Sequence, residues 1–232
     1  MEKRKRFFSI ALDATLHPAE FFGKDGFEAA HEGIGKALIF QLKGWALLGA
    51  AFIVSVLFGG TFPGIDSDVQ KQWGLAWLAG MILLLVAFII GNLFVVSGIS
   101  HLILRPGKAK GRFSTTFSVM SYSMSPALAF VGPAYVILGS VLDKFSSQMW
   151  ASFLIALLSI AFTMTLSWLM VIAFVGLSER CGVSLFRAFI SVFIGILVVN
   201  VFWTAAANVL TYYLVTLPAM DLTGALNGTL TG

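Results

Sequence analysis

The stretch that decides the fold is Met149–Ser178, which reads MWASFLIALLSIAFTMTLSWLMVIAFVGLS and contains no charged residue. A helix that crosses the hydrocarbon core of a bilayer needs about 20 predominantly apolar residues, and this stretch exceeds that length. The whole chain of 232 residues has the same character, because 58% of its residues are hydrophobic and only 11% are charged. An ordinary soluble domain carries roughly 25% charged residues. We therefore predict an integral membrane protein.

Four further apolar runs lie on either side of this stretch, and the first of them can extend back to Ala37. They are Gly44–Phe62, Trp73–Leu104, Phe113–Leu142 and Ala188–Leu217. None of the runs shows the alternation of a barrel strand, so all five should be helices. The prediction is an all-α, polytopic membrane protein. Residues 1–36 form a cytoplasmic and interfacial segment, 37–217 the five-helix domain, and 218–232 a flexible external tail.

Positive charge alternates between the loops in the way that this span count requires. The segment before the first span and the second and fourth loops together carry 12 Lys and Arg residues. The opposite side carries only Lys71 and Lys144. Because basic loops stay in the cytoplasm, the N-terminus should be cytoplasmic and the C-terminus external. We expect a multi-pass protein of the cytoplasmic (inner) cell membrane.

The first 22 residues predict a short helix at the membrane surface, with a disordered basic tail as the alternative. Apolar side chains recur at a spacing of four, after a basic run, at Phe8, Leu12 and Leu16. This pattern favours an amphipathic helix that lies in the cytoplasmic interface. Pro18 disfavours a helical conformation at His17 and can itself open a second helix that carries Phe21 and Phe22.

Patterns that would indicate an enzyme are incomplete. His31-Glu32 begins like a zinc-protease motif, but position 35 is glycine rather than histidine. The single cysteine, Cys181, and three scattered histidines show no metal-ligand spacing. The predicted spans contain no carboxylate that could serve as a proton relay. We expect no enzymatic activity, no metal, no cofactor and no nucleic-acid partner.

Three asparagines lie inside predicted spans, at Asn92, Asn200 and Asn208. Asn200 and Asn208 are eight residues apart and therefore share roughly one helix face. These side chains either line a polar cavity or form hydrogen bonds between helices, which are worth about 0.6–2 kcal/mol each. A water-filled cavity would favour transport, and a dry centre filled by Leu and Phe would favour a scaffolding role.

The third span contains two prolines, and we predict a hinge at the first, formed by Tyr122, Ser123 and Pro126. Pro126 cannot donate to the carbonyl of Tyr122, and an unpaired carbonyl in lipid costs several kcal/mol. Ser123, Ser125 or a neighbouring asparagine is expected to satisfy it. The bend should pack the first half of this span against the fifth. It serves either to shape the bundle or to gate a path.

The loop before this span is a candidate binding surface for anionic lipids. It concentrates four positive charges at Arg105, Lys108, Lys110 and Arg112. Each basic residue near an anionic membrane surface contributes about 1 kcal/mol.

Motifs along the chain resemble those of the Yip-domain family of Ypt/Rab-interacting membrane proteins, and in particular its prokaryotic members. They include Pro18-x-x-Phe21-Phe22, the basic glycine loop 107–113, Tyr122-Ser123-x-x-Pro126, Trp168, Gly176-Leu177 and Ser184-x-x-Arg187-Ala188. The similarity covers about residues 15–215. It implies a five-span protein with a cytoplasmic N-terminus. The eukaryotic members' Asp-Leu-Tyr-Gly-Pro motif is absent, so a Rab GTPase partner is not expected.

Two functions stay open at this level. The first is a non-enzymatic membrane protein that organises membrane lipids or partner proteins, including a second copy of itself. The second is a small transporter, channel or lipid-translocating protein with a path along spans two, three and five.

Overall fold

The computed structural model describes residues 7–23, 27, 32–57, 67–107, 111–143, 145 and 147–211. Within these ranges the chain is helical and has no strand. The N-terminal helices are α1 (Phe7–Leu16) and α2 (Pro18–Phe22), and the long ones are α4 (Ile34–Leu57), α5 (Ser67–Leu104), α8 (Met149–Cys181) and α9 (Leu185–Thr211). The third span consists of α6 (Phe113–Ser123), the π-helical segment η2 (Ala127–Val131) and α7 (Gly132–Asp143), and a short 3-10 turn, η1 (Arg105–Gly107), follows α5.

Five helical segments are long and apolar enough to cross a membrane, which confirms the predicted count. They are Ile34–Ser55, Val86–Leu104, Phe113–Leu142, Met149–Cys181 and Leu185–Ala206. The predicted third and fourth spans begin at the observed residues. The predicted tail, 218–232, lies outside the described residues.

The first long helix begins at Ile34, ten residues before Gly44 and three before Ala37, to which the prediction extends the span. Lys36 and Lys43 do not interrupt it, because both side chains lie on its exposed face and lysine is a good helix former. An uncharged run alone starts this span at Gly44, because it treats a lysine as a boundary, whereas the extension past Lys43 to Ala37 comes close to the observed start.

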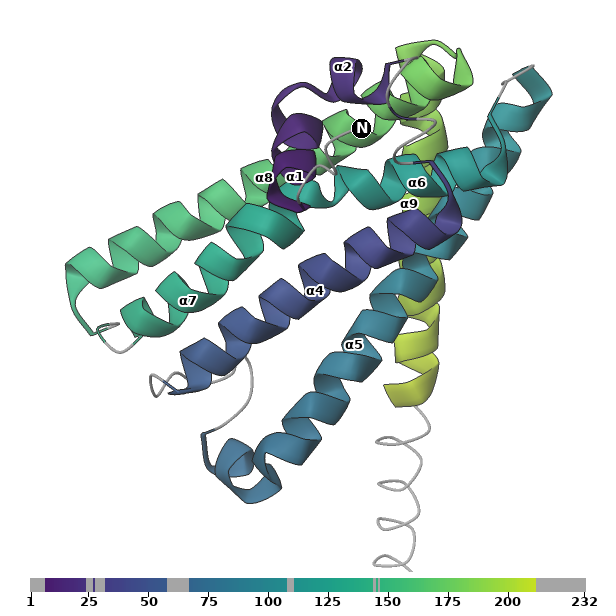
Figure 1. Cartoon of the computed structure of the whole chain (residues 1–232). Coiled ribbons are helices and arrows are strands. Elements are labelled where there is room, and N and C mark those ends of the chain that lie inside the picture. Colours follow the sequence, from purple (N-terminus) through teal and green to yellow (C-terminus); the bar gives the residue numbers. More distant parts are fainter. Residues whose placement is uncertain are drawn as a thin grey trace, which may run out of the picture.

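The long helices converge at one end of the bundle and spread apart toward the other (Figure 1). We call the first of these the basic end, because Arg105, Arg112, Arg180 and Arg187 lie there, at the ends of α5, α6, α8 and α9. The helices pack mainly as α5 with α9 and as α4 with α7, while α4 and α5 scarcely touch. Most of the buried core lies near the basic end, and α8 is exposed along most of its length.

Candidate functional site: the basic end of the bundle

Helix α6 is the centre of the basic end. Every residue from Thr115 to Ser123 is buried, although six of these nine are Ser, Thr or Tyr. The helix packs against α4, α5 and α8. The prediction that this half of the third span packs chiefly against the fifth is therefore wrong. The fifth span, α9, packs instead on α5, where Gly195 allows a close approach to Val96 and Ser100.

The regular α-helix of the third span is interrupted near Pro126, as the sequence predicts. Regular α-helix ends at Ser123, and a π-helical segment follows Pro126. The hydroxyl of Ser125 donates to the carbonyl of Tyr122, so one of the predicted serines satisfies that acceptor. The Gln41 amide, Nε2, donates to the carbonyl of Ser121 at 2.7 Å. Because both carbonyls have donors, the break is stable inside the membrane. Movement at this hinge stays a prediction.

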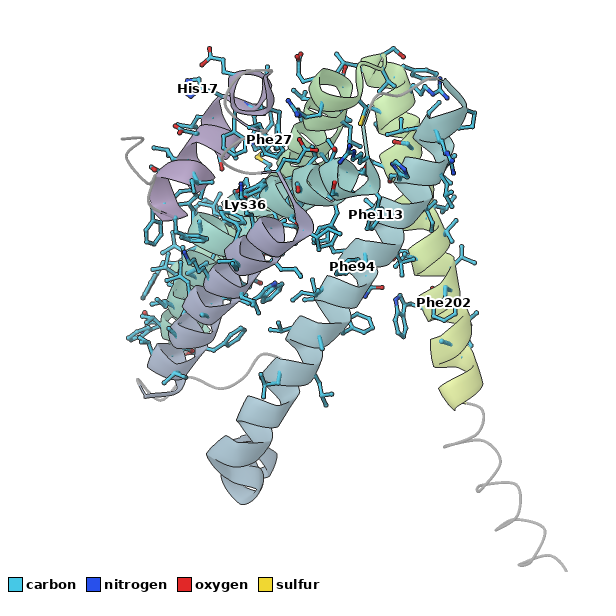
Figure 2. All side chains as sticks on the ribbon, turned by 45° about the vertical axis from the view of Figure 1, so that its right-hand side comes forward. His17, Phe27, Lys36, Phe94, Phe113 and Phe202 are labelled. Atoms are coloured by element: carbon cyan, nitrogen blue, oxygen red, sulfur yellow. The ribbon has the colours of Figure 1, made fainter. Side chains whose placement is uncertain are left out.

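The N-terminal segment covers α6 with aromatic side chains. The Tyr122 ring lies 4.6 Å from that of Phe40 and 5.7 Å from those of Phe21 and Phe27, measured between centroids. Phe27 stands between the N-terminal helices and α6 in Figure 2. Phe22 is fully buried against α8, where only a glycine fits at position 176: a Cβ atom there would lie 2.7 Å from the Phe22 ring. The core of this end thus combines a cluster of aromatic side chains with the buried polar side chains of α6.

An ion pair joins the start of α4 to the end of α8. Glu32 Oε2 lies 2.9 Å from Arg180 Nη2, and the two side chains are 19% and 5% exposed. The hydroxyl of Thr115, on α6, donates to the other oxygen of Glu32. The Arg180 guanidinium lies 5.4 Å from the centre of the Phe27 ring. One carboxylate therefore connects three elements and the aromatic cluster.

The remaining arginines divide into a structural and an exposed group. Arg187 donates to the carbonyls of Ile103 and Leu104 at 3.4 Å each, so it caps the end of α5. Arg105 and Arg112 are exposed at the two ends of the predicted lipid-binding loop. Lys108 and Lys110, the other two residues of that prediction, lie outside the described residues.

Helix α1 has one face on the protein and one face free of it. Ala11 and Ala14 are fully buried. Phe8, Leu12 and Leu16, which were predicted to form an apolar face, are 53%, 48% and 58% exposed. The Trp168 indole N–H, on α8, donates to the carbonyl of Thr15 at 3.0 Å and fixes the end of α1. The predicted helix and its free apolar face are both present, as is the second helix that begins at Pro18.

A comparison with protein-family models matches residues 13–215 to the Yip1 domain. The chain belongs to the Yip1 family. This match covers all five spans and agrees with the resemblance that the sequence motifs indicate. Comparisons with curated proteins and with solved structures gave no match.

No described hydrogen bond joins any two of the three intramembrane asparagines of this Yip1-family protein. Asn92 Oδ1 accepts a hydrogen bond of 2.6 Å from the Trp203 indole, which links α5 to α9. Asn200 donates to the carbonyl of Ile196 in its own helix, and its side chain and that of Asn208 are exposed. Asn92 thus has the bridging role, one of the two interpretations of these residues.

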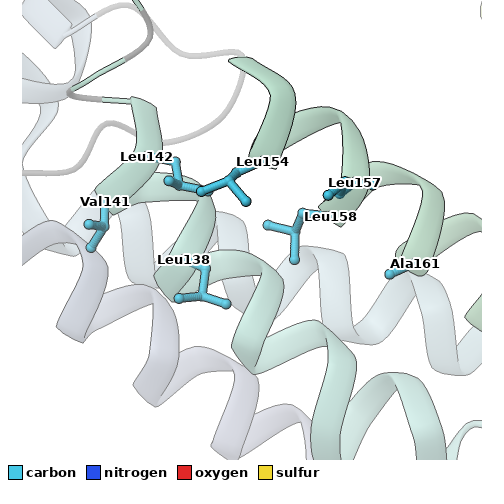
Figure 3. Close-up of a pocket in the computed structure, with 7 residues that line it drawn as sticks. All are labelled: Leu138, Val141, Leu142, Leu154, Leu157, Leu158 and Ala161. Atoms are coloured by element: carbon cyan, nitrogen blue, oxygen red, sulfur yellow. The ribbon is translucent and has the colours of Figure 1, made fainter. Parts of the chain in front are cut away.

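An apolar groove lies between α7 and α8, at the end of the bundle opposite the basic end (Figure 3). Its volume is about 400 Å³. Its lining consists of Leu138, Val141, Leu142, Leu154, Leu157, Leu158 and Ala161. Because no lining side chain can donate or accept a hydrogen bond, the groove suits an acyl chain rather than a polar solute.

Sequence reasoning missed Glu32, Thr115 and Gln41. Glu32 was read only as part of an incomplete metal motif, and Arg180 only as a loop charge. A signal was available for Gln41, since a glutamine inside an apolar helix requires a hydrogen-bond partner.

Proposed function

We propose that this Yip1-family protein is a non-enzymatic protein of the cell membrane that organises anionic lipids in the cytoplasmic leaflet. The observation that carries the proposal is the free apolar face of α1, which lies at the same end of the bundle as the exposed arginines. A helix with an exposed apolar face beside positive charge binds the boundary between headgroups and acyl chains of an anionic membrane. The basic end then faces the cytoplasm, as the positive-inside rule requires.

Two further features support a lipid role. The described hydrophobic core includes a cluster of aromatic side chains at the basic end, which favours scaffolding over a polar path. The groove between α7 and α8 has an apolar lining that suits an acyl chain. A protein that carries out no chemistry can still sort lipids, because differential affinity alone changes their local distribution.

The test is the number of anionic lipids that the purified protein retains, measured by native mass spectrometry with phosphatidylglycerol and phosphatidylcholine of matched chains. The test variant replaces Arg105, Lys108, Lys110 and Arg112 with glutamine. At about 1 kcal/mol for each charge, phosphatidylglycerol retention should fall more than tenfold at low salt. The control variant replaces Lys71 and Lys144, at the opposite side, and should retain lipid normally. Unchanged retention in the test variant would remove this loop from the proposed function.

A second function is favoured by one observation, the broken third span. Interrupted helices buried at membrane depth are typical of transporter substrate sites. Protein-dependent flux of a lipid or solute across liposomes, altered by Pro126→Ala without loss of stability, would support this alternative. Absence of flux together with charge-dependent lipid retention would support the first proposal.

A further inference from the structure

Lys43 is a cation in the membrane-spanning part of α4. It lies nine residues after Ile34, where the helix begins, which is at most about 14 Å along the helix axis. Its side chain is exposed on the outside of the bundle. Among the described residues it makes no ion pair or hydrogen bond. An ammonium group at this depth requires an anion or water, so an intramembrane lysine indicates a functional contact.

The described part of the protein does not offer that anion. The elements that pack on this part of α4 are α6, η2, α7 and, through Phe7 on Phe40, α1. The carboxylate with a described side chain on these elements is Asp13, on α1, which has an interaction of its own and makes none with Lys43. Glu32, which precedes α4, is held by Arg180. Lys43 therefore has no carboxylate partner within the described part of the chain, and an anion from the membrane can take that place.

A second lysine lies on the same face, toward the start of α4 (Figure 2). Lys36 is exposed and precedes Lys43 by seven residues, which is two helical turns or about 10 Å. Between them lies Phe40, whose ring is 5.0 Å from that of Phe7 on α1. Residues three and four apart are neighbours on a helix surface. The first turn of α1 therefore lies beside both lysines.

Apolar side chains surround the two charges. Ile39, between the lysines, is 55% exposed, and Phe8, on the first turn of α1, is 53% exposed. Further into the span, Ala46 and Ala50 are exposed on the same side of α4 and leave room beside the helix. We call this surface, formed by Phe8, Lys36, Ile39, Lys43 and Ala46, the α1–α4 seam.

We propose that the α1–α4 seam is a binding site for one anionic phospholipid of the leaflet at the basic end, with its phosphate between Lys36 and Lys43 and an acyl chain over Ala46 and Ala50. The charges are complementary, and the pairing satisfies an ammonium group that would otherwise lie unpaired beside hydrocarbon. The site deepens the proposed function and rests on it for the choice of a lipid. It is separate from the loop that contains Arg105 and Arg112.

The experiment uses the full chain in nanodiscs that contain phosphatidylcholine and a phosphatidylglycerol with a photoreactive acyl chain. Crosslinked peptides are mapped by mass spectrometry. The variants are Lys43→Gln and its conservative counterpart Lys43→Arg, and the control is Lys24→Gln, which removes the same charge outside the predicted spans. Each lysine should contribute about fivefold to local occupancy, given about 1 kcal/mol for each charge.

The proposal expects crosslinks in residues 34–57 that fall about fivefold in Lys43→Gln and persist in Lys43→Arg and Lys24→Gln. Photoreactive phosphatidylcholine should give fewer crosslinks there. Equal labelling by both lipids, or equal labelling of Lys43→Gln and the wild type, would overturn it. If Lys43→Gln fails to fold, the proposal is decided by the wild type alone, from the crosslinks that the two photoreactive lipids give in residues 34–57. Variants of the loop at Arg105 and Arg112 should not change crosslinks at the seam, so failure of the loop proposal is distinguishable from failure of this one.

Discussion

Removal of the Glu32 carboxylate should destabilise the basic end strongly. Breaking a buried ion pair by removing one partner costs about 3–5 kcal/mol, because the other charge is left buried. Arg180 is 5% exposed and Glu32 is 19% exposed, so the lower end of that range applies. Glu32→Gln should therefore cost about 3 kcal/mol, which corresponds to about 6–12 °C in the unfolding temperature of a chain of this size.

Thermal unfolding in detergent measures this effect, and a double-mutant cycle assigns it to the pair. Glu32→Gln, Arg180→Met and the double variant are compared, and the double variant should be more stable than the sum of the single changes implies. Glu179→Gln is the control, since it removes a carboxylate from an exposed side chain next to Arg180. Additive effects, or a shift in Glu32→Gln no larger than that of Glu179→Gln, would refute the reasoning.

Three other predictions concern the membrane-spanning helices, and the same unfolding assay measures all three. Gln41→Leu should cost about 0.5–1.5 kcal/mol, because the carbonyl of Ser121 loses its shorter hydrogen bond and keeps the one from the Met124 N–H. Pro126→Ala should reduce the stability less than Gln41→Leu does, because Ser125 already satisfies the carbonyl of Tyr122. A larger loss of stability from Pro126→Ala would show that the proline itself maintains the break. Trp203→Phe removes the hydrogen bond to Asn92 and should cost about 0.6–2 kcal/mol. The control is Trp150→Phe, which should change the stability little, because the Trp150 indole is exposed and donates only to Gln148, two residues away.

The spans could be predicted from the sequence because a long apolar run without charged residues is typical of a membrane-spanning helix. The fourth predicted span begins at Met149, as the observed one does. The break at Pro126 was predictable for a similar reason, since a proline removes a specific backbone donor. These are local effects, and one stretch of chain contains all the information that they need.

The contacts of the basic end could not be predicted in this way, because they join residues far apart in the chain. Arg180 has the same type of charge as Arg105, yet one is buried in an ion pair and the other is exposed. Only the packing of α8 against α6 and the N-terminal segment separates the two. Likewise, the sequence places Phe21 and Phe22 on a second short helix, but only the packing shows that both are buried against the protein.

The orientation of the bundle is the most direct test of the account, because a lipid role for the basic end requires that it face the cytoplasm. The measurement labels single cysteines with a membrane-impermeant maleimide in a Cys181→Ser background. Ser184→Cys lies in the exposed turn between α8 and α9 at the basic end, and Ser147→Cys is exposed before α8 at the other end. The account predicts that Ser147→Cys is labelled on intact cells and that Ser184→Cys is labelled only after the membrane is opened. Labelling of Ser184→Cys on intact cells would contradict it.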